Sequence, residues 1–448
     1  MKTCRMVISM LALMTLFFAC QETQETGREV IKLEYLYGSM ENLTDVIVHD
    51  IFSPPVASRI YAYPSVAAYE IMAQSDSSYR SLAGQLKGLK PIPQPQGEII
   101  PELAALEAFN EVGKNLIFSE DRVIAYRDSI FQLIRNDGLT GEIYDNSIAY
   151  GDAVAAHIML WSSEDNYKQS RTFMKHTISN REGTWQPTPP AYMEAIEPHW
   201  NSIRPFAIDS ADQFTPERPT EFSTDKDSKF YQEVMHVYET VNNLNEEQQE
   251  IASFWDCNPY VMNVRGHVMF ATKKITPGGH WMGIAKIATE TAKADFAKST
   301  MTYALTSIAL ADGFISCWDE KYRSNLIRPE TVINRYIDEE WVPMLQTPPF
   351  PEYTSGHSVI SGAAGEALTS IYGDNFHFVD DTEAKYGLPV REFDSFRDAS
   401  SEAAISRLYG GIHYMPAIDN GVKQGRALGN YIVDKLSFRT DGKKQEVQ

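Results

Sequence analysis

Apolar residues recur three and four positions apart along most of the chain, a spacing typical of amphipathic helices. It predicts helices over residues 102–118, 119–136, 142–161, 228–243, 245–255, 282–300 and 301–316. Ser119 is predicted as an N-cap. Another helix should open after Ser53, because Pro54 and Pro55 suit a first turn, where the missing N–H costs little. Convincing alternation of period two is absent, so the predicted fold class is all-α, a helical bundle.

The segment 181–224 interrupts this pattern. It is rich in Pro, Thr and Trp and is predicted as an irregular connection. It belongs to an N-terminal helical region, residues 31–225, which is followed by a second helical bundle, residues 226–440, and by a polar tail, residues 441–448. No repeat of solenoid length is found. The sequence therefore predicts two helical regions joined by one irregular stretch.

The first residues predict export. Lys2 and Arg5 precede an apolar run, residues 6–18, and Ala19-Cys20 follows. Residues 1–19 are interpreted as a lipoprotein signal peptide, Cys20 as the lipidated first residue, and residues 20–30 as a tether. The alternative is an ordinary cleaved signal with an incidental cysteine. The expected location is the periplasm or outer membrane of a Gram-negative bacterium, with membrane attachment only through the N-terminal lipid.

Charge and the remaining polar residues narrow the function. The formal net charge is −20 and basic residues are scattered, so nucleic acid is not an expected partner. Cys257 and Cys317 are expected as two buried free thiols, with a disulfide as the alternative. The histidines at 199, 267 and 280 form no recognisable spaced pair with acids or cysteines, so no zinc site is predicted.

Candidate chemistry begins at Lys321 and Arg328, which Pro329 follows. Proline disfavours helical backbone at the preceding residue, so the chain should leave a helix near Lys321 and carry both cations along its exit. An arginine fork and a lysine point charge suit a tetrahedral or trigonal oxyanion. Alone, two such cations are more often a solvated helix face.

A second segment reads Ser355-Gly356-His357, and a buried helix face ending at Gly373 follows it. The three residues should therefore lie at a helix N-terminus. Free backbone N–H groups and the helix dipole favour an anion there, and the Ser355 hydroxyl adds a donor. A plain serine cap is the simpler interpretation of this segment alone.

The third segment places Arg407 six residues before His413. Gly410-Gly411 should break the helix and let His413 return toward the same pocket, while Pro416 starts the final helix. Asp419 is then a candidate to hold the imidazole in one tautomer.

In this order the three segments resemble the superfamily of vanadium haloperoxidases and type-2 phosphatidic acid phosphatases. The resemblance implies an all-helical bundle with an oxyanion pocket between helices. It assigns Lys321, Arg328 and Arg407 to the oxyanion's charge, Ser355 and the Gly356 amide to its hydrogen bonds, His357 to acid–base chemistry, and His413 to the bond with vanadium or phosphorus. The expected cofactor is vanadate, for which phosphate competes. Asp419 departs from the phosphatase pattern, whose aspartate would fall at Ala417.

Three aromatic residues favour the peroxidase. Trp318, Phe350 and Tyr260 resemble supporting or halide-pocket residues of periplasmic bacterial vanadium iodo- and bromoperoxidase-like lipoproteins. The implied substrates are hydrogen peroxide and iodide or bromide. A soluble acid phosphatase that attacks phosphate esters through a phosphohistidine stays open, as does a non-catalytic lipoprotein that binds an oxyanion or a glycan. The binder would not need both His357 and His413.

The lipid-anchor interpretation makes a direct prediction. Cys20→Ala should release the protein from the membrane fraction, because the single acylated residue is lost. Fractionation followed by intact-mass analysis measures this. An N-terminus that begins elsewhere and carries no lipid would contradict the interpretation.

Overall fold

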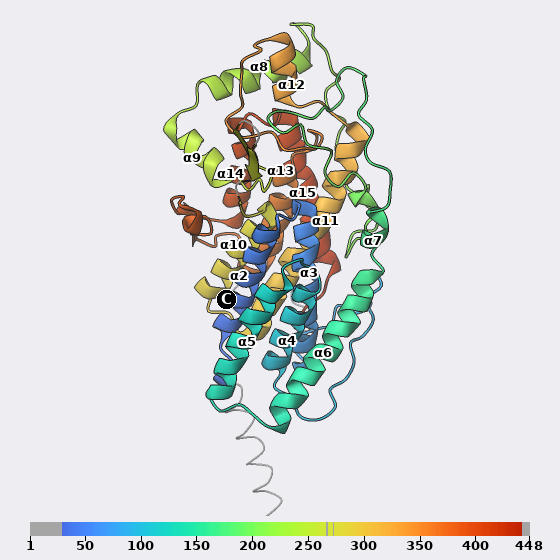
Figure 1. The fold of residues 1–448 in the computed structure, drawn as a ribbon, viewed down its shortest axis with the longest axis vertical. Coiled ribbons are helices and arrows are strands. Elements are labelled where there is room, and N and C mark those ends of the chain that lie inside the picture. Colours follow the sequence, from blue (N-terminus) through green and yellow to red (C-terminus); the bar gives the residue numbers. More distant parts are fainter. Residues whose placement is uncertain (1–28, 266–267, 272, 441–448) are drawn as a thin grey trace, which may run out of the picture.

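The computed structural model describes residues 29–440, apart from 266–267 and 272. The predicted signal peptide, Cys20, most of the tether and the polar tail lie outside the described residues, as does His267. The described chain is an elongated helical bundle (Figure 1). The predicted all-α class is confirmed.

The N-terminal region supplies one end of the bundle (Figure 1). Its helices are α2 (Leu33–Asp50), α3 (Pro54–Ser75), α4 (Pro101–Lys114), α5 (Glu120–Asn136), α6 (Glu142–Ser163) and the short α7 (Tyr167–Ser170). Irregular chain with one 3-10 turn, η1 (Trp200–Ser202), leads from α7 to α8.

The second region holds α8 (Lys229–Asn242), α9 (Glu246–Phe254), α10 (Pro277–Thr291), α11 (Phe296–Ser324), α12 (Pro329–Tyr336), α13 (Gly356–Tyr372), α14 (Phe396–Tyr409) and α15 (Met415–Lys435). Two short antiparallel pairs were not predicted. They are β1 (Met262–Arg265) with β2 (Val268–Ala271), and β3 (Phe378–Asp380) with β4 (Arg391–Phe393), and η2 (Ala384–Tyr386) lies between β3 and β4. Strands this short leave too few residues for alternation to be recognised.

The predicted boundary between residues 300 and 301 is wrong. α10 ends at Thr291, and α11 runs unbroken from Phe296 to Ser324. The break falls at Asp295, whose side chain accepts a hydrogen bond from the Lys298 N–H and caps α11. Thr300 lies inside α11, where its hydroxyl donates to the carbonyl of Ala297 one turn back.

Capping residues position the other helix starts largely as predicted. Ser53, Ser228 and Asn245 each accept a hydrogen bond from a backbone N–H in the first turn of α3, α8 and α9. Ser119 stands at the N-cap position of α5, but its side chain bonds to Asp50 instead of capping. The helix start is therefore confirmed and the capping role is not.

One continuous hydrophobic core joins the two regions, from Ile31 to Phe438. The long helix α11 packs against α3 of the first region and α13 of the second. Its buried Asp312 also accepts hydrogen bonds from the backbone N–H groups of Phe206, Ala207 and Ile208, at 2.7, 2.7 and 2.9 Å. These bonds fasten the irregular connection to the core, because buried N–H groups need an acceptor.

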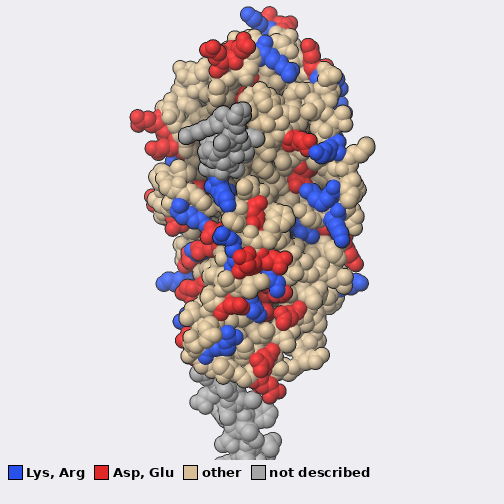
Figure 2. Space-filling view, in the orientation of Figure 1, with Lys and Arg blue, Asp and Glu red and all other residues tan. Residues whose placement is uncertain are grey.

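The surface agrees with the sequence. On the face in Figure 2, acidic and basic side chains are interspersed, and no extended basic patch appears there. In the part of the chain that the structure describes, no helix is long and apolar enough to cross a membrane. Cys257 and Cys317 are buried free thiols, as predicted.

Candidate active site

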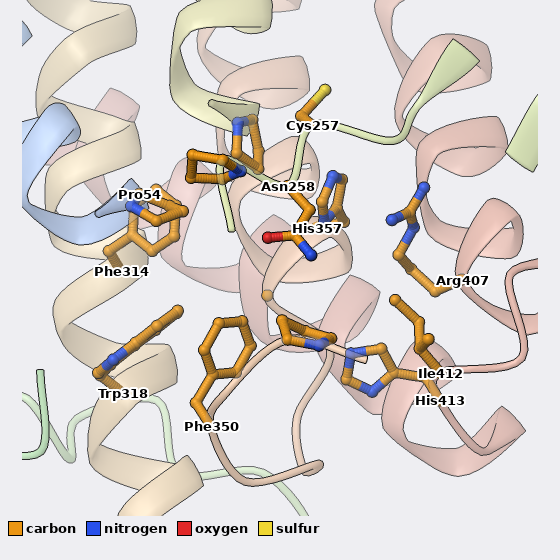
Figure 3. Close-up of a pocket in the computed structure, with 14 residues that line it drawn as sticks. Pro54, Cys257, Asn258, Phe314, Trp318, Phe350, His357, Arg407, Ile412 and His413 are labelled. Atoms are coloured by element: carbon orange, nitrogen blue, oxygen red, sulfur yellow. The ribbon is translucent and has the colours of Figure 1, made fainter. Parts of the chain in front are cut away.

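Three helix N-termini meet at one pocket. Pro54, Pro277 and Gly356 begin α3, α10 and α13, and all three line it (Figure 3). Side chains from α11, from the loops after α9 and before α13, and from the end of α14 and the loop that follows it complete the wall. Because each helix N-terminus carries partial positive charge, this convergence favours an anion in the pocket.

Arg328 is buried beside the pocket with one corner of its fork free. It is the N-cap residue of α12, in the extended backbone conformation expected before Pro329. Its Nε donates to the carbonyl of Phe350 at 2.9 Å and its Nη1 to that of Ile412 at 2.8 Å. Its Nη2 is buried and finds no hydrogen-bond partner among the described residues. That N–H pair is available to an anion.

His413 is held from both sides. Its Nδ1 lies 2.8 Å from the Glu352 carboxylate, and its Nε2 lies 3.1 Å from Nη1 of Arg328. A guanidinium can only donate, so Nε2 must carry a lone pair and Nδ1 the proton. Burial lowers the pKa of His413 well below its usual value, and the charges of Arg328 and Lys321 add to this. The ring is therefore neutral, with the basic nitrogen on the Arg328 side.

The carboxylate that orients His413 belongs to Glu352, whereas the sequence analysis predicted Asp419. Its Oε1 accepts from His413 Nδ1 and from the Tyr414 N–H, and the side chain is fully buried. Burial raises the pKa of Glu352 to about 7, against the opposing charges of Arg328 and Lys321. Asp419 was predicted to hold the imidazole, and that prediction is wrong. Asp419 is an exposed residue of α15, where its charge stays hydrated.

Lys321 adds positive charge to the pocket, but its N–H groups are already bonded to the protein. It is buried in the last turn of α11, and its ammonium donates to the carbonyls of Pro351, Glu352 and Thr354 at 3.0, 3.1 and 2.5 Å. Three bonds use all three N–H groups. Burial lowers the pKa of Lys321 to about 8. This lysine therefore shapes the segment before Ser355 while it adds positive charge to the pocket.

The start of α13 brings Ser355, Gly356 and His357 together as predicted. Ser355 caps the helix, since its hydroxyl oxygen accepts from the Ser358 N–H at 3.3 Å, and it also accepts from the Ser358 hydroxyl at 2.8 Å. Gly356 and His357 line the pocket, whereas Ser355 is buried and is not among the lining residues. A Cβ added at Gly356 would meet Trp318 and Lys321 only at ordinary contact distances, so the glycine leaves room for a ligand there.

His357 faces His413 across the pocket (Figure 3). Its ring bonds to the backbone of Trp255, and its Nε2 is buried without a partner among the described residues. Burial lowers the pKa of His357 well below its usual value, and the charges of Arg407 and His280 act in the same direction. A neutral imidazole with a bare nitrogen can accept a proton from a ligand.

Arg407 closes the charged side of the pocket. It lies in the last turn of α14, and its Nη2 donates to the Trp255 carbonyl at 2.7 Å. The predicted helix break follows, since α14 ends at Tyr409 and Gly411 adopts a positive φ of 75°. α15 begins at Met415 with Pro416 in its first turn, so His413 turns back toward the pocket as expected.

Two of the three predicted aromatic residues line the pocket, and the third does not. Trp318 and Phe350 line the pocket with ring centroids 4.9 Å apart, and the Lys321 ammonium lies 5.7 and 5.1 Å from the two centroids. Tyr260 is not among the lining residues, although Asn258 and Pro259 of the same loop are. The loop instead holds Tyr260 through its backbone, because its N–H donates to Asn258 and its carbonyl accepts from Gln346.

The assembled groups fit a tetrahedral oxyanion. Arg328, Lys321 and Arg407 bring three cations, the α13 N-terminus brings backbone N–H groups, and one buried carboxylate opposes them. The unpartnered Arg328 Nη2 and His357 Nε2 are buried polar atoms that such a ligand would satisfy. His413 Nε2 supplies the neutral nitrogen that a covalent or coordinate bond requires.

Comparisons with known proteins identify a family model and solved structures that are similar to this chain. A family model described as the VCPO second helical-bundle domain matches residues 301–442. The crystal structure of the first bacterial vanadium-dependent iodoperoxidase shares 56% sequence identity, covers 92% of this chain and 98% of its own, and has a TM-score of 0.87. No curated protein matches the chain.

Two more distant structures share the fold. A holo-type bacterial vanadium-dependent chloroperoxidase is 15% identical with a TM-score of 0.63, over 86% of this chain and 93% of its own. The apo-type chloroperoxidase is 16% identical with a TM-score of 0.66, over 86% and 94%. At this identity the likeness concerns the fold alone. The 56% identity over nearly the whole length settles the family: the chain belongs to the vanadium-dependent haloperoxidases.

Proposed function

We propose that the protein oxidises iodide with hydrogen peroxide at a vanadate held by His413. The observation that carries this proposal is the 56% identity with a bacterial vanadium-dependent iodoperoxidase over 92% of the chain. The pocket supports it with a neutral, oriented imidazole beside an unsatisfied guanidinium. When bound, vanadate supplies a Lewis-acid centre at which peroxide becomes an oxidant of halide.

The chain's own residues divide into holding groups and one proton carrier. His413 Nε2 would bond the vanadium, Arg328 Nη2 and the amides at the start of α13 would donate to oxygens, and Lys321 and Arg407 would neutralise charge. His357 would take the proton of incoming hydrogen peroxide on its bare Nε2, since the ring is neutral before the ligand binds.

Iodide rather than a smaller halide suits the lining. Outside the charged side, the pocket wall is mostly apolar, with Phe314, Trp318, Phe350 and several prolines. Moving an anion from water to such a wall costs a desolvation free energy that falls as the ion grows. Iodide is the largest of the common halides, so its desolvation free energy is the smallest. Bromide is the next candidate.

The proposed location is the cell envelope. The sequence before residue 29 supports export and lipidation at Cys20, with the enzyme attached to the membrane through that lipid. Peroxide and iodide then reach the pocket from the periplasm or the exterior.

The proposal predicts a vanadate-dependent activity. Metal-free protein should oxidise iodide with peroxide only after orthovanadate is added, and phosphate should inhibit reconstitution by competing for the same pocket. Triiodide absorbance measures the first, and hydrolysis of a chromogenic phosphate ester is assayed in parallel. Ester hydrolysis with no vanadate-dependent iodide oxidation would move the protein to the phosphatase reading.

Glu352 should control cofactor retention without touching it. Glu352→Ala leaves His413 Nδ1 and the Tyr414 N–H without their acceptor, so vanadate affinity should fall about 10–100-fold, as for other residues that orient a metal ligand. Glu352→Gln keeps an acceptor oxygen and should recover most of that loss. Equilibrium dialysis measures both, with Glu330→Gln as a control at another buried carboxylate. Equal affinities in wild type and Glu352→Ala would refute the role.

Substitutions of the two pocket histidines should have different effects on vanadate binding and turnover. His413→Ala should lose bound vanadate together with activity, because its Nε2 is the nitrogen offered to the metal. His357→Ala should keep vanadate and lose turnover by about 10²–10⁴-fold, the usual size of an acid–base contribution. The exposed His377 provides the control substitution His377→Ala. If both variants lose vanadate equally, the assigned roles are wrong.

A further inference from the structure

Behind one wall of the pocket lies a second cluster of polar side chains that the proposed reaction does not use. Cys257 comes from the loop after α9, His280 from the first turn of α10, and Glu383 from the segment between β3 and η2. All three are buried, at 1%, 0% and 5% exposure. In Figure 3 the Cys257 sulfur points away from His357.

The three ligand atoms form a compact triangle. Cys257 Sγ lies 3.5 Å from His280 Nδ1 and 3.7 Å from Glu383 Oε1, and Nδ1 lies 3.2 Å from Oε1. A tetrahedral Zn²⁺ with bonds of about 2.3 Å to sulfur and about 2.0–2.2 Å to nitrogen and oxygen separates its ligand atoms by roughly 3.3–3.7 Å. The observed triangle has this size. A single N–H on Nδ1, by contrast, cannot point along both of its edges.

A carboxylate braces the histidine from its other side. Asp380 Oδ2 lies 2.8 Å from His280 Nε2, and Asp380 Oδ1 accepts from the Thr382 N–H at 3.0 Å. Trp255 stacks on the imidazole at 4.5 Å with an interplanar angle of 18°. This second carboxylate would keep the proton on Nε2 and leave the Nδ1 lone pair for a metal, an arrangement common around metal-binding histidines.

A fourth group lacks a partner at the same place. Tyr386, three residues after Glu383, packs against the apolar residues around Cys257. Its hydroxyl is buried and has no hydrogen-bond partner among the described residues. A water on the fourth coordination position of a metal would give this hydroxyl a partner.

We propose that Cys257, His280 and Glu383 form a zinc site, with Asp380 as the brace of His280. Thiolate, imidazole and carboxylate together suit Zn²⁺ better than the oxygen-preferring Mg²⁺ or Ca²⁺. Binding releases the Cys257 thiol proton and the proton between His280 and Glu383. The metal's two positive charges replace those two protons, so the charge of the buried cluster is unchanged.

The metal would fix one wall of the active site. It would tie the loop of residues 255–259 to α10 and to the segment between β3 and β4. That loop carries the Trp255 carbonyl that accepts from Arg407 at 2.7 Å, and it contributes Cys257, Asn258 and Pro259 to the pocket lining. The role is structural, because all three ligands are buried.

Metal analysis of vanadate-free protein tests the proposal independently of iodide oxidation. After exposure to Zn²⁺ and dialysis against metal-free buffer, wild type should retain about one zinc per chain by mass spectrometry. Cys257→Ala should retain less than a tenth of that amount. Cys317→Ala removes the other buried thiol and should retain the wild-type content. Zinc below a tenth of an equivalent in wild type, or equal zinc in the two variants, would overturn the site.

Cobalt provides a spectroscopic readout of the proposed thiolate ligand that does not depend on Cys257→Ala folding. Co²⁺-loaded wild type should show a near-ultraviolet thiolate charge-transfer band, because Cys257 is a proposed ligand, and visible bands typical of a tetrahedral site. The Cys317→Ala protein should keep both. Adding a chelator to the zinc-loaded wild type should lower its melting temperature by several degrees, because removing a ligand of the folded state destabilises the fold. A Co²⁺ spectrum without the charge-transfer band would exclude the thiolate and the proposal with it.

Discussion

The imidazole of His413 lies between a guanidinium and a carboxylate, all three excluded from solvent. Arg328 can only donate, so it holds the bare Nε2, and Glu352 accepts the proton of Nδ1. Removing either partner would leave a buried hydrogen-bonding group of the imidazole unsatisfied, which costs about 1–3 kcal/mol, so both ends of the row matter. This row of three groups sets the tautomer and the orientation on which vanadate binding depends.

Much of the surrounding fold holds the row in place. Arg328 is fixed by the α11–α12 exit and by the carbonyls of Phe350 and Ile412. Lys321 donates to three carbonyls of the segment that carries Glu352, and so shapes the approach to α13. The same segment therefore positions both the brace of His413 and the helix N-terminus.

The sequence predicted most helices and brought the principal site residues together, because helical spacing and the ordered Lys-Arg, Ser-Gly-His and Arg-His segments are local patterns. Glu352 was missed, although a carboxylate between Pro351 and Tyr353 in an apolar stretch was a usable signal of burial. Asp419 was chosen for proximity in sequence, but the first turns of α15 place it at the surface. The Cys257 cluster has no sequence signature, since its residues lie 23 and 126 positions apart.

The two clusters share one loop. Trp255 accepts from Arg407 through its carbonyl and stacks on His280 through its ring, so the same residue contacts both the charged pocket and the second cluster. The family's reaction thus rests on local geometry that extends beyond the groups nearest the oxyanion.

The state of the His413 ring tests the account most directly. Nitrogen-15 chemical shifts of vanadate-free protein labelled at histidine distinguish protonated from bare ring nitrogens, and His413→Ala identifies the resonances. The account predicts a neutral ring at pH 7 with the proton on Nδ1 and a bare Nε2. A proton on Nε2, or an imidazolium, would contradict it.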